Sequence, residues 1–254
     1  MDMHWIENLE RECIAGRKGW VALIDPDKIR NEDDLTWLRG VHPHSIFLGG
    51  SLVSTGNMAA TARWIRGCSE RPIVLFPGSP TQLTGEADAL LFLSVISGRN
   101  PEALIGAHVQ AAPQVRALGL PAVPCGYILI DGGRPTAASY MSGTTPIPSD
   151  QPEIAAATAL AGAYLGLRCI YLDAGSGAKQ AVSGELIAAV RAATDLPLIV
   201  GGGIRSADAA LDAWSAGADL VVIGNAFEDR PALSAELSSA MAGGHQKSKV
   251  KPSE

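Results

Sequence analysis

The chain has 254 residues, of which 47% are hydrophobic and 18% are charged, and its formal net charge is −6. This composition is typical of a globular protein with a substantial core, and the acidic balance argues against nucleic-acid binding. No apolar run approaches the roughly 18 residues of a transmembrane helix, and the amphipathic helix expected at the amino terminus lacks the features of a signal peptide. We therefore expect a cytoplasmic protein without a transmembrane segment.

Eight short apolar runs recur along the chain, and each is continuous rather than alternating, as buried parallel strands are. They cover residues 20–25, 45–50, 72–77, 89–95, 126–131, 168–174, 196–202 and 219–225. Helical patterns lie between most of them, at 57–67, 101–118, 152–165, 183–194, 206–216 and 229–241. This alternation predicts one α/β domain over residues 1–242, a TIM (β/α)8 barrel, and a disordered polar tail at 243–254. A doubly wound open sheet is the alternative fold.

The connection between the third and fourth apolar runs is unusual. Only the segment PGSPTQLTGEAD, residues 77–88, separates them, and it is too rich in proline and glycine for a full helix. We therefore expect a modified barrel in which the third helix is missing or replaced.

The last two runs end in glycine, at Gly201-Gly202-Gly203 and at Gly224-Asn225. In TIM barrels the chemistry lies at the carboxyl ends of the strands, and the loops after strands seven and eight commonly bind phosphate. Backbone N–H groups bind the anion there, and a Cβ at Gly202 or Gly203 would hold it away. The two ends together predict a phosphate site, with tight turns as the alternative explanation.

The sixth run ends in YLDAGSG, residues 171–177. Asp173 is expected to project into the barrel mouth, where a carboxylate could bind a substrate hydroxyl or take its proton. Tyr171 and Ser176 could bind the rest of the small molecule. A purely structural role for Asp173, capping the following turn, fits the spacing equally well.

Oxygen-bearing side chains also follow the first two runs, at Asp25 in LIDPDK and at Ser51 in FLGGS. Such ligands suit Mg²⁺, which takes one or two protein groups and completes its shell with water and phosphate oxygens. A helix cap at Asp25 and a turn position at Ser51 are the alternatives.

The segments LIDPDK, FLGGS, ADALLFLSVISGRNPEALIGAHV, GYILIDGG, YLDAGSGA, VGGGIRS and VVIGN together resemble the geranylgeranylglyceryl phosphate synthase family, which includes the heptaprenylglyceryl phosphate synthases. The resemblance implies a modified (β/α)8 barrel that lacks the third helix. It also implies a Mg²⁺-dependent prenyltransferase of ether phospholipid biosynthesis, which joins the 3-hydroxyl of sn-glycerol 1-phosphate to a polyprenyl diphosphate and releases diphosphate. Geranylgeranyl diphosphate is the expected donor, and a homo-oligomer, dimer or hexamer, is the expected assembly.

By position, the resemblance makes Asp25 and Ser51 the magnesium ligands and Asp173 the catalytic residue. The implied glycerol-phosphate site comprises Tyr171, Leu172, Asp173, Ala174, Gly175, Ser176, Gly177, Gly202, Gly203, Gly224 and Asn225. Two positions depart from the family: Leu23 stands where a lysine is often found, and Asp173 stands where glutamate is common. The prenyl tail is expected to lie in an apolar groove between the helix after Pro101 and the gap left by the third helix.

Two other functions, and a variant of the synthase itself, stay open on sequence grounds. An isomerase or lyase acting on a sugar phosphate would share the glycine loops but would need an acid–base pair on opposite strands. A non-catalytic phosphate-binding barrel would need no retained carboxylates. A synthase with another phosphorylated acceptor, such as a phosphoglycerate, would need a basic residue near the glycerol site, and the sequence alone assigns none.

Overall fold

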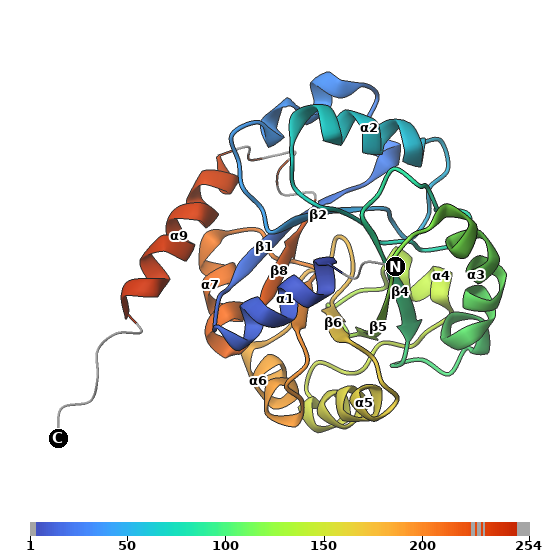
Figure 1. The fold of residues 1–254 in the computed structure, drawn as a ribbon. Coiled ribbons are helices and arrows are strands. Elements are labelled where there is room, and N and C mark those ends of the chain that lie inside the picture. Colours follow the sequence, from blue (N-terminus) through green and yellow to red (C-terminus); the bar gives the residue numbers. More distant parts are fainter. Residues whose placement is uncertain (1–3, 225–226, 228–229, 231, 248–254) are drawn as a thin grey trace.

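The computed structural model describes residues 4–224, 227, 230 and 232–247, and its eight parallel strands close into a barrel in chain order (Figure 1). The strands are β1 Gly19–Ile24, β2 Ser45–Leu48, β3 Ile73–Leu75, β4 Ala89–Val95, β5 Ala122–Leu129, β6 Cys169–Asp173, β7 Leu198–Gly201 and β8 Leu220–Ile223. Pairing of β1 with β8 closes the ring. The predicted barrel is therefore confirmed, and the open sheet is excluded.

Helices surround the barrel wherever the sequence has a helical pattern (Figure 1). They are α1 His4–Ile14, α2 Met58–Cys68, α3 Ala107–Leu118, α4 Ala137–Ser142, α5 Pro152–Tyr164, α6 Gly184–Ala193, α7 Ala207–Ala216 and α9 Leu233–Lys247, with the 3₁₀ turns η1 Pro26–Lys28 and η2 Glu32–Leu38 and the π-helical turn η3 Glu102–Gly106. No helix within the described ranges is long and apolar enough to cross a membrane.

The third helix is absent, as the sequence predicts. Residues 76–88, all of which are described, contain turns and bends but no helix between β3 and β4. The segment leaves one side of the barrel without the helical cover that the other connections supply.

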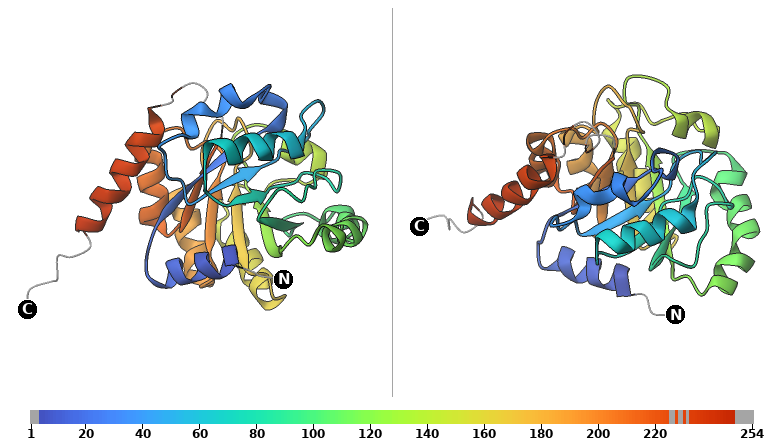
Figure 2. Two further views of the ribbon diagram at one scale, coloured as in Figure 1. Left: turned by 45° about the horizontal axis from the view of Figure 1, so that its top comes forward. Right: turned by 90° about the horizontal axis from the view of Figure 1, so that it is seen from above.

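Two apolar cores account for the continuous apolar runs. Alternate strand residues such as Phe47 and Tyr171 point into the barrel, whereas Ile46 and Leu172 point outward to the helices. Helix α1 lies across the amino-terminal end of the barrel, opposite η1 and η2 (Figure 2), and its buried Trp5, Ile6 and Leu9 join the inner core. Because both strand faces are buried, the strands do not show an alternating pattern.

The carboxyl-terminal boundary differs from the prediction. The chain was expected to leave the barrel domain at residue 242, but α9 continues to Lys247. The first five residues of the expected tail, 243–247, are therefore helical, and residues 248–254 lie outside the described part of the chain. Polar composition alone did not distinguish a helix from a tail.

Candidate active site

A cavity of about 760 Å³ opens at the carboxyl ends of the strands. At one end it is lined by Asp25, Asp173 and the glycines after β7 and β8. At the other end it runs between the 76–88 loop and α3, where Leu83 and Ala111 line it. The cavity therefore joins the polar barrel mouth to the space that a third helix would cover, as the sequence predicts for a groove.

Asp173, the last residue of β6, is 7% exposed and lines the polar end of this cavity. One carboxylate oxygen accepts a hydrogen bond from the Tyr127 hydroxyl and the other from the Gly175 N–H, each at 2.6 Å. Burial raises the pKa of the Asp173 carboxyl, while these two hydrogen bonds oppose the rise. The two hydrogen bonds thus fix the direction of the carboxylate, and burial disfavours its charged form.

The remaining YLDAGSG residues divide according to the pleat of β6. Tyr171 and Asp173 point into the barrel and line the cavity, whereas the side chains of Leu172 and Ala174 lie in the outer core among the helices. The side chains of Leu172 and Ala174, two residues of the implied glycerol-phosphate site, therefore do not face the cavity. Inward and outward residues alternate along the strand, but both kinds are apolar when both faces are buried, so the sequence pattern does not distinguish them.

The loop after β6 brings Ser176 and Gly177 to the cavity, while Gly175 contributes its N–H to Asp173. A basic residue also lies here, which the sequence analysis missed. Arg205 lines the cavity and donates a hydrogen bond to the Ala178 carbonyl at 2.8 Å. Its position two residues after the glycine run was the available signal.

Gly202, Gly203 and Gly224 all line the polar end of the cavity, and Asn225 lies outside the described residues. Glycine at Gly202 and Gly203 is required by the fold itself, in addition to any need for a ligand to approach the backbone. Their φ angles are +78° and +75°, and a Cβ on Gly202 would lie 2.6 Å from Asp173 Oδ1. The protein's own packing therefore requires glycine here, whether or not an anion is bound.

Asp25 and Ser51 both line the cavity at the ends of β1 and β2. Asp25 also caps η1 by accepting a hydrogen bond from the Asp27 N–H at 3.0 Å, so its capping and cavity positions coexist. A Cβ on Gly50 would make an ordinary van der Waals contact with the Asp25 carboxylate, at 3.6 Å. Among the described residues no group of three or more His, Cys, Asp or Glu gathers to hold a metal.

Asp27 fastens the loop that follows Ser51 to the loop that follows β1. Its carboxylate accepts hydrogen bonds from the N–H groups of Ser54, Thr55 and Gly56 and from the Ser54 hydroxyl. These donors hold the pKa of the Asp27 carboxyl far below its ordinary value. The two metal-ligand candidates are thus carried by loops that are tied together.

The apolar end of the cavity is formed by Phe92 of β4 and by Ala107, His108 and Ala111 of α3. His108 is 8% exposed; its Nε2 lies 3.3 Å from Ser94 Oγ, and its ring packs edge-on against Phe92 at 4.4 Å between centroids. Burial lowers the pKa of His108, so the neutral form is favoured in this apolar groove. Its packed position agrees with a structural rather than a catalytic histidine.

The sequence profile of the PcrB family matches residues 12–241. A geranylgeranylglyceryl phosphate synthase of Spirosoma linguale is 48% identical over 231 residues, which cover 90% of this chain and 93% of that protein. A protein of the same name from Methanothermobacter marburgensis is 39% identical, with coverages of 88% and 92%. The solved structure of (S)-3-O-geranylgeranylglyceryl phosphate synthase from Thermoplasma acidophilum, in complex with its substrate sn-glycerol-1-phosphate, has a TM-score of 0.85 at 28% identity and covers 95% of this chain and 98% of that chain.

Proposed function

The chain belongs to the PcrB family and is a prenyltransferase, and we propose that it joins the 3-hydroxyl of sn-glycerol 1-phosphate to geranylgeranyl diphosphate and releases diphosphate. The synthase names of the relatives, over nine-tenths of the chain, argue against a sugar-phosphate isomerase and against a non-catalytic barrel. A place in ether phospholipid biosynthesis follows from the product of that reaction.

One observation supports the proposal above the others: a single cavity has a carboxylate and glycine loops at one end and an apolar groove at the other. A glycerol phosphate needs backbone donors and a hydroxyl acceptor, which the loops after β6, β7 and β8 offer. A polyprenyl chain needs a long apolar surface, which Leu83, Phe92 and the alanines of α3 offer.

In the proposed reaction Asp173 accepts a hydrogen bond from the 3-hydroxyl of the bound glycerol phosphate. The hydroxyl oxygen forms a bond to C1 of the prenyl group, the bond from C1 to the diphosphate oxygen breaks, and its electron pair leaves with diphosphate. The hydroxyl proton passes to the Asp173 carboxylate. The glycine loops orient the acceptor, and the apolar groove holds the donor chain against it and excludes water.

Magnesium fits the donor set, because Asp25 and Ser51 offer two oxygen ligands on the wall of the same cavity. The small number of protein ligands suits this ion, which keeps water and phosphate oxygens in its shell. When bound, it would neutralise negative charge on the diphosphate. We propose Asp25 and Ser51 as its protein ligands.

Arg205 makes a phosphoglycerate a second candidate acceptor, because a guanidinium at the cavity wall could pair with the carboxylate of that molecule. Its hydrogen bond to Ala178 occupies only part of its donor set. The homo-oligomer and the cytoplasmic location stay predictions of the sequence.

Radiolabelled acceptor and unlabelled donor test the proposed reaction. The protein is incubated with Mg²⁺, labelled sn-glycerol 1-phosphate and, separately, farnesyl, geranylgeranyl and heptaprenyl diphosphate, and the mixture is extracted with organic solvent. We expect label in the organic phase, most of it with geranylgeranyl diphosphate. Absence of extractable label with every donor would contradict the proposal. More extractable label from labelled phosphoglycerate than from labelled sn-glycerol 1-phosphate would favour phosphoglycerate as the acceptor.

A further inference from the structure

Tyr127 is a cavity residue that no sequence motif above assigns to a role, although it lies in the GYILID segment of β5. Its hydroxyl donates a 2.6 Å hydrogen bond to Asp173 Oδ2, and its side chain lines the same cavity. The parallel register pairs Tyr127 with Tyr171 and Leu129 with Asp173, so the phenol reaches diagonally across to the carboxylate.

The ring of Tyr127 is held in place by aromatic neighbours. Its centroid lies 5.6 Å from that of Tyr171 and 6.3 Å from that of Phe76, and the side chain is buried in the inner core. A ring packed in this way cannot turn freely, so its hydroxyl is presented to Asp173 in one direction. The other carboxylate oxygen is fixed by the Gly175 N–H. The carboxylate thus has one donor on each oxygen.

We propose that Tyr127 is the positioning residue for the catalytic carboxylate of Asp173. The inference rests on the proposed function. The aspartate side chain is short and has few orientations with which to meet a substrate hydroxyl. The hydrogen bond from Tyr127 holds Oδ2 in place and leaves lone pairs of the carboxylate for the acceptor hydroxyl.

Tyr127 acts through Asp173 rather than as the base itself. Burial raises the pKa of the Tyr127 phenol, and the Asp173 charge beside it acts in the same direction, so the phenol keeps its proton. Tyr171 of β6 and the Gly175 N–H, from the loop that follows β6, also face the carboxylate, and Gly202 faces it from the β7 loop. A protonated donor stabilises the ionised carboxylate and is therefore expected to keep it available at lower pH.

Tyr127→Phe tests the proposal, because it keeps the packed ring and removes only the hydroxyl. We expect kcat to fall roughly 10–100-fold, as for loss of a hydrogen bond to a charged group, with little change in KM for sn-glycerol 1-phosphate. We also expect the acidic limb of the kcat/KM profile to move to higher pH, since the carboxylate loses a donor that favours its ionised form. Tyr164→Phe, which removes a phenol oxygen from an exposed position on α5, is the matched control and should behave as wild type.

An unchanged kcat and pH profile in Tyr127→Phe would overturn the proposal, and so would an equal loss in Tyr164→Phe. A readout independent of turnover is the pKa of the Asp173 carboxyl. It is measured by carbon-13 NMR, with the Asp173 resonance assigned from its loss in Asp173→Asn. That pKa should be higher in Tyr127→Phe than in wild type, and equal values would overturn the proposal even if the wild-type protein transfers no prenyl group. Difluorotyrosine at position 127, a stronger donor, should lower the same pKa, and a rise would count against the proposal.

Discussion

Gly202 lies where the chain turns from β7 toward α7 with a φ angle of +78°. A side chain there would face both backbone strain and contact with Asp173 Oδ1 and the Gly175 N–H, each at 2.6 Å from the added Cβ. We expect Gly202→Ala to lower the free energy of unfolding by about 1–3 kcal/mol and to weaken sn-glycerol 1-phosphate binding. Urea denaturation and calorimetry measure the two effects.

Gly184→Ala is the matched control for this experiment. Gly184 begins α6, its φ is not in the left-handed region, and an added Cβ would make an ordinary 3.6 Å contact with Ala216. This variant should keep wild-type stability and affinity. If Gly202→Ala matched it in both measurements, the geometric requirement for glycine at position 202 would be wrong.

Asp173 carries a prediction about pH. Burial raises the pKa of its carboxyl, so the folded protein binds this proton more tightly than the unfolded chain does. The stabilising effect is complete below the ordinary carboxyl pKa and is lost as pH rises through the raised value. Asp173→Asn should therefore gain stability relative to wild type between about pH 4 and about pH 8, as urea midpoints at both pH values would reveal.

The same substitution removes the proposed base. We expect kcat of Asp173→Asn to fall by roughly 10²–10⁴-fold, the usual contribution of a general base, while KM for sn-glycerol 1-phosphate changes much less. A rise in KM with kcat preserved would make Asp173 a binding group only.

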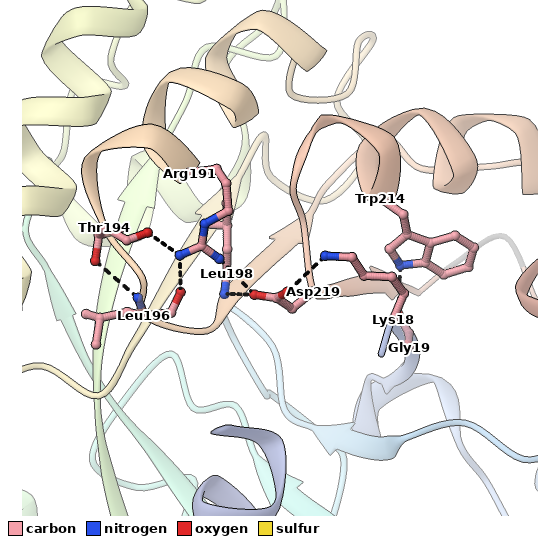
Figure 3. Close-up of polar contacts among 8 residues, drawn as sticks. All are labelled: Lys18, Gly19, Arg191, Thr194, Leu196, Leu198, Trp214 and Asp219. Atoms are coloured by element: carbon pink, nitrogen blue, oxygen red, sulfur yellow. Dashed lines mark hydrogen bonds and ion pairs between the residues drawn. The ribbon is translucent and has the colours of Figure 1, made fainter. Parts of the chain in front are cut away.

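At the scale of elements, an ion-pair network joins the amino-terminal ends of β1, β7 and β8 (Figure 3). Asp219, 4% exposed, accepts hydrogen bonds from Lys18 and Arg191 at 3.0 Å and from the Leu198 N–H at 2.9 Å. Arg191 in addition donates to the carbonyls of Thr194 and Leu196. The network therefore ties the two strands that complete the barrel to α6 and to the strand that begins it.

Asp219→Ala should destabilise the protein without altering the site. Removal of the carboxylate leaves two cations and a backbone donor without their shared partner, and we expect a loss of about 2–4 kcal/mol, because Lys18 and Arg191 stay partly solvated. KM for sn-glycerol 1-phosphate should be unchanged, since the network lies at the strand ends opposite the cavity. An unchanged urea midpoint would show that the network is not needed to close the barrel.

The elements themselves were largely predictable from the sequence, because a buried parallel strand leaves a short apolar run and a helix leaves a 3.6-residue period. The missing third helix was predictable for the same reason, through the proline and glycine of residues 77–88. The short helix α4 and the 3₁₀ turn η2 were not predicted, since one or two turns carry too little pattern to distinguish them from loops.

The site was predictable only in part. Strand order and the rule that chemistry lies at carboxyl ends placed Asp25, Ser51 and Asp173 on one cavity. The inward or outward direction of Leu172, and the hydrogen bond from Tyr127 to Asp173, depend on the barrel register, which continuous apolar strands do not reveal. Asn225 lies outside the described residues, so its predicted role stays a prediction.

At the scale of the whole molecule, the proposed function requires a single cavity to receive the glycerol phosphate at the barrel mouth and the prenyl chain along α3. Ala107 lines the apolar part of the cavity, whereas Val109, two residues later, is 67% exposed on the outer side of the same helix. A tryptophan at position 107 would fill the groove, and one at position 109 would extend into solvent.

The most direct test compares Ala107→Trp with Val109→Trp in the prenyl-transfer assay. We predict that Ala107→Trp loses at least about tenfold in kcat/KM for geranylgeranyl diphosphate, the scale of a lost apolar pocket, and keeps the wild-type KM for sn-glycerol 1-phosphate. Val109→Trp should match wild type for both substrates. Undiminished use of geranylgeranyl diphosphate by a folded Ala107→Trp protein would contradict the placement of the prenyl chain in this cavity.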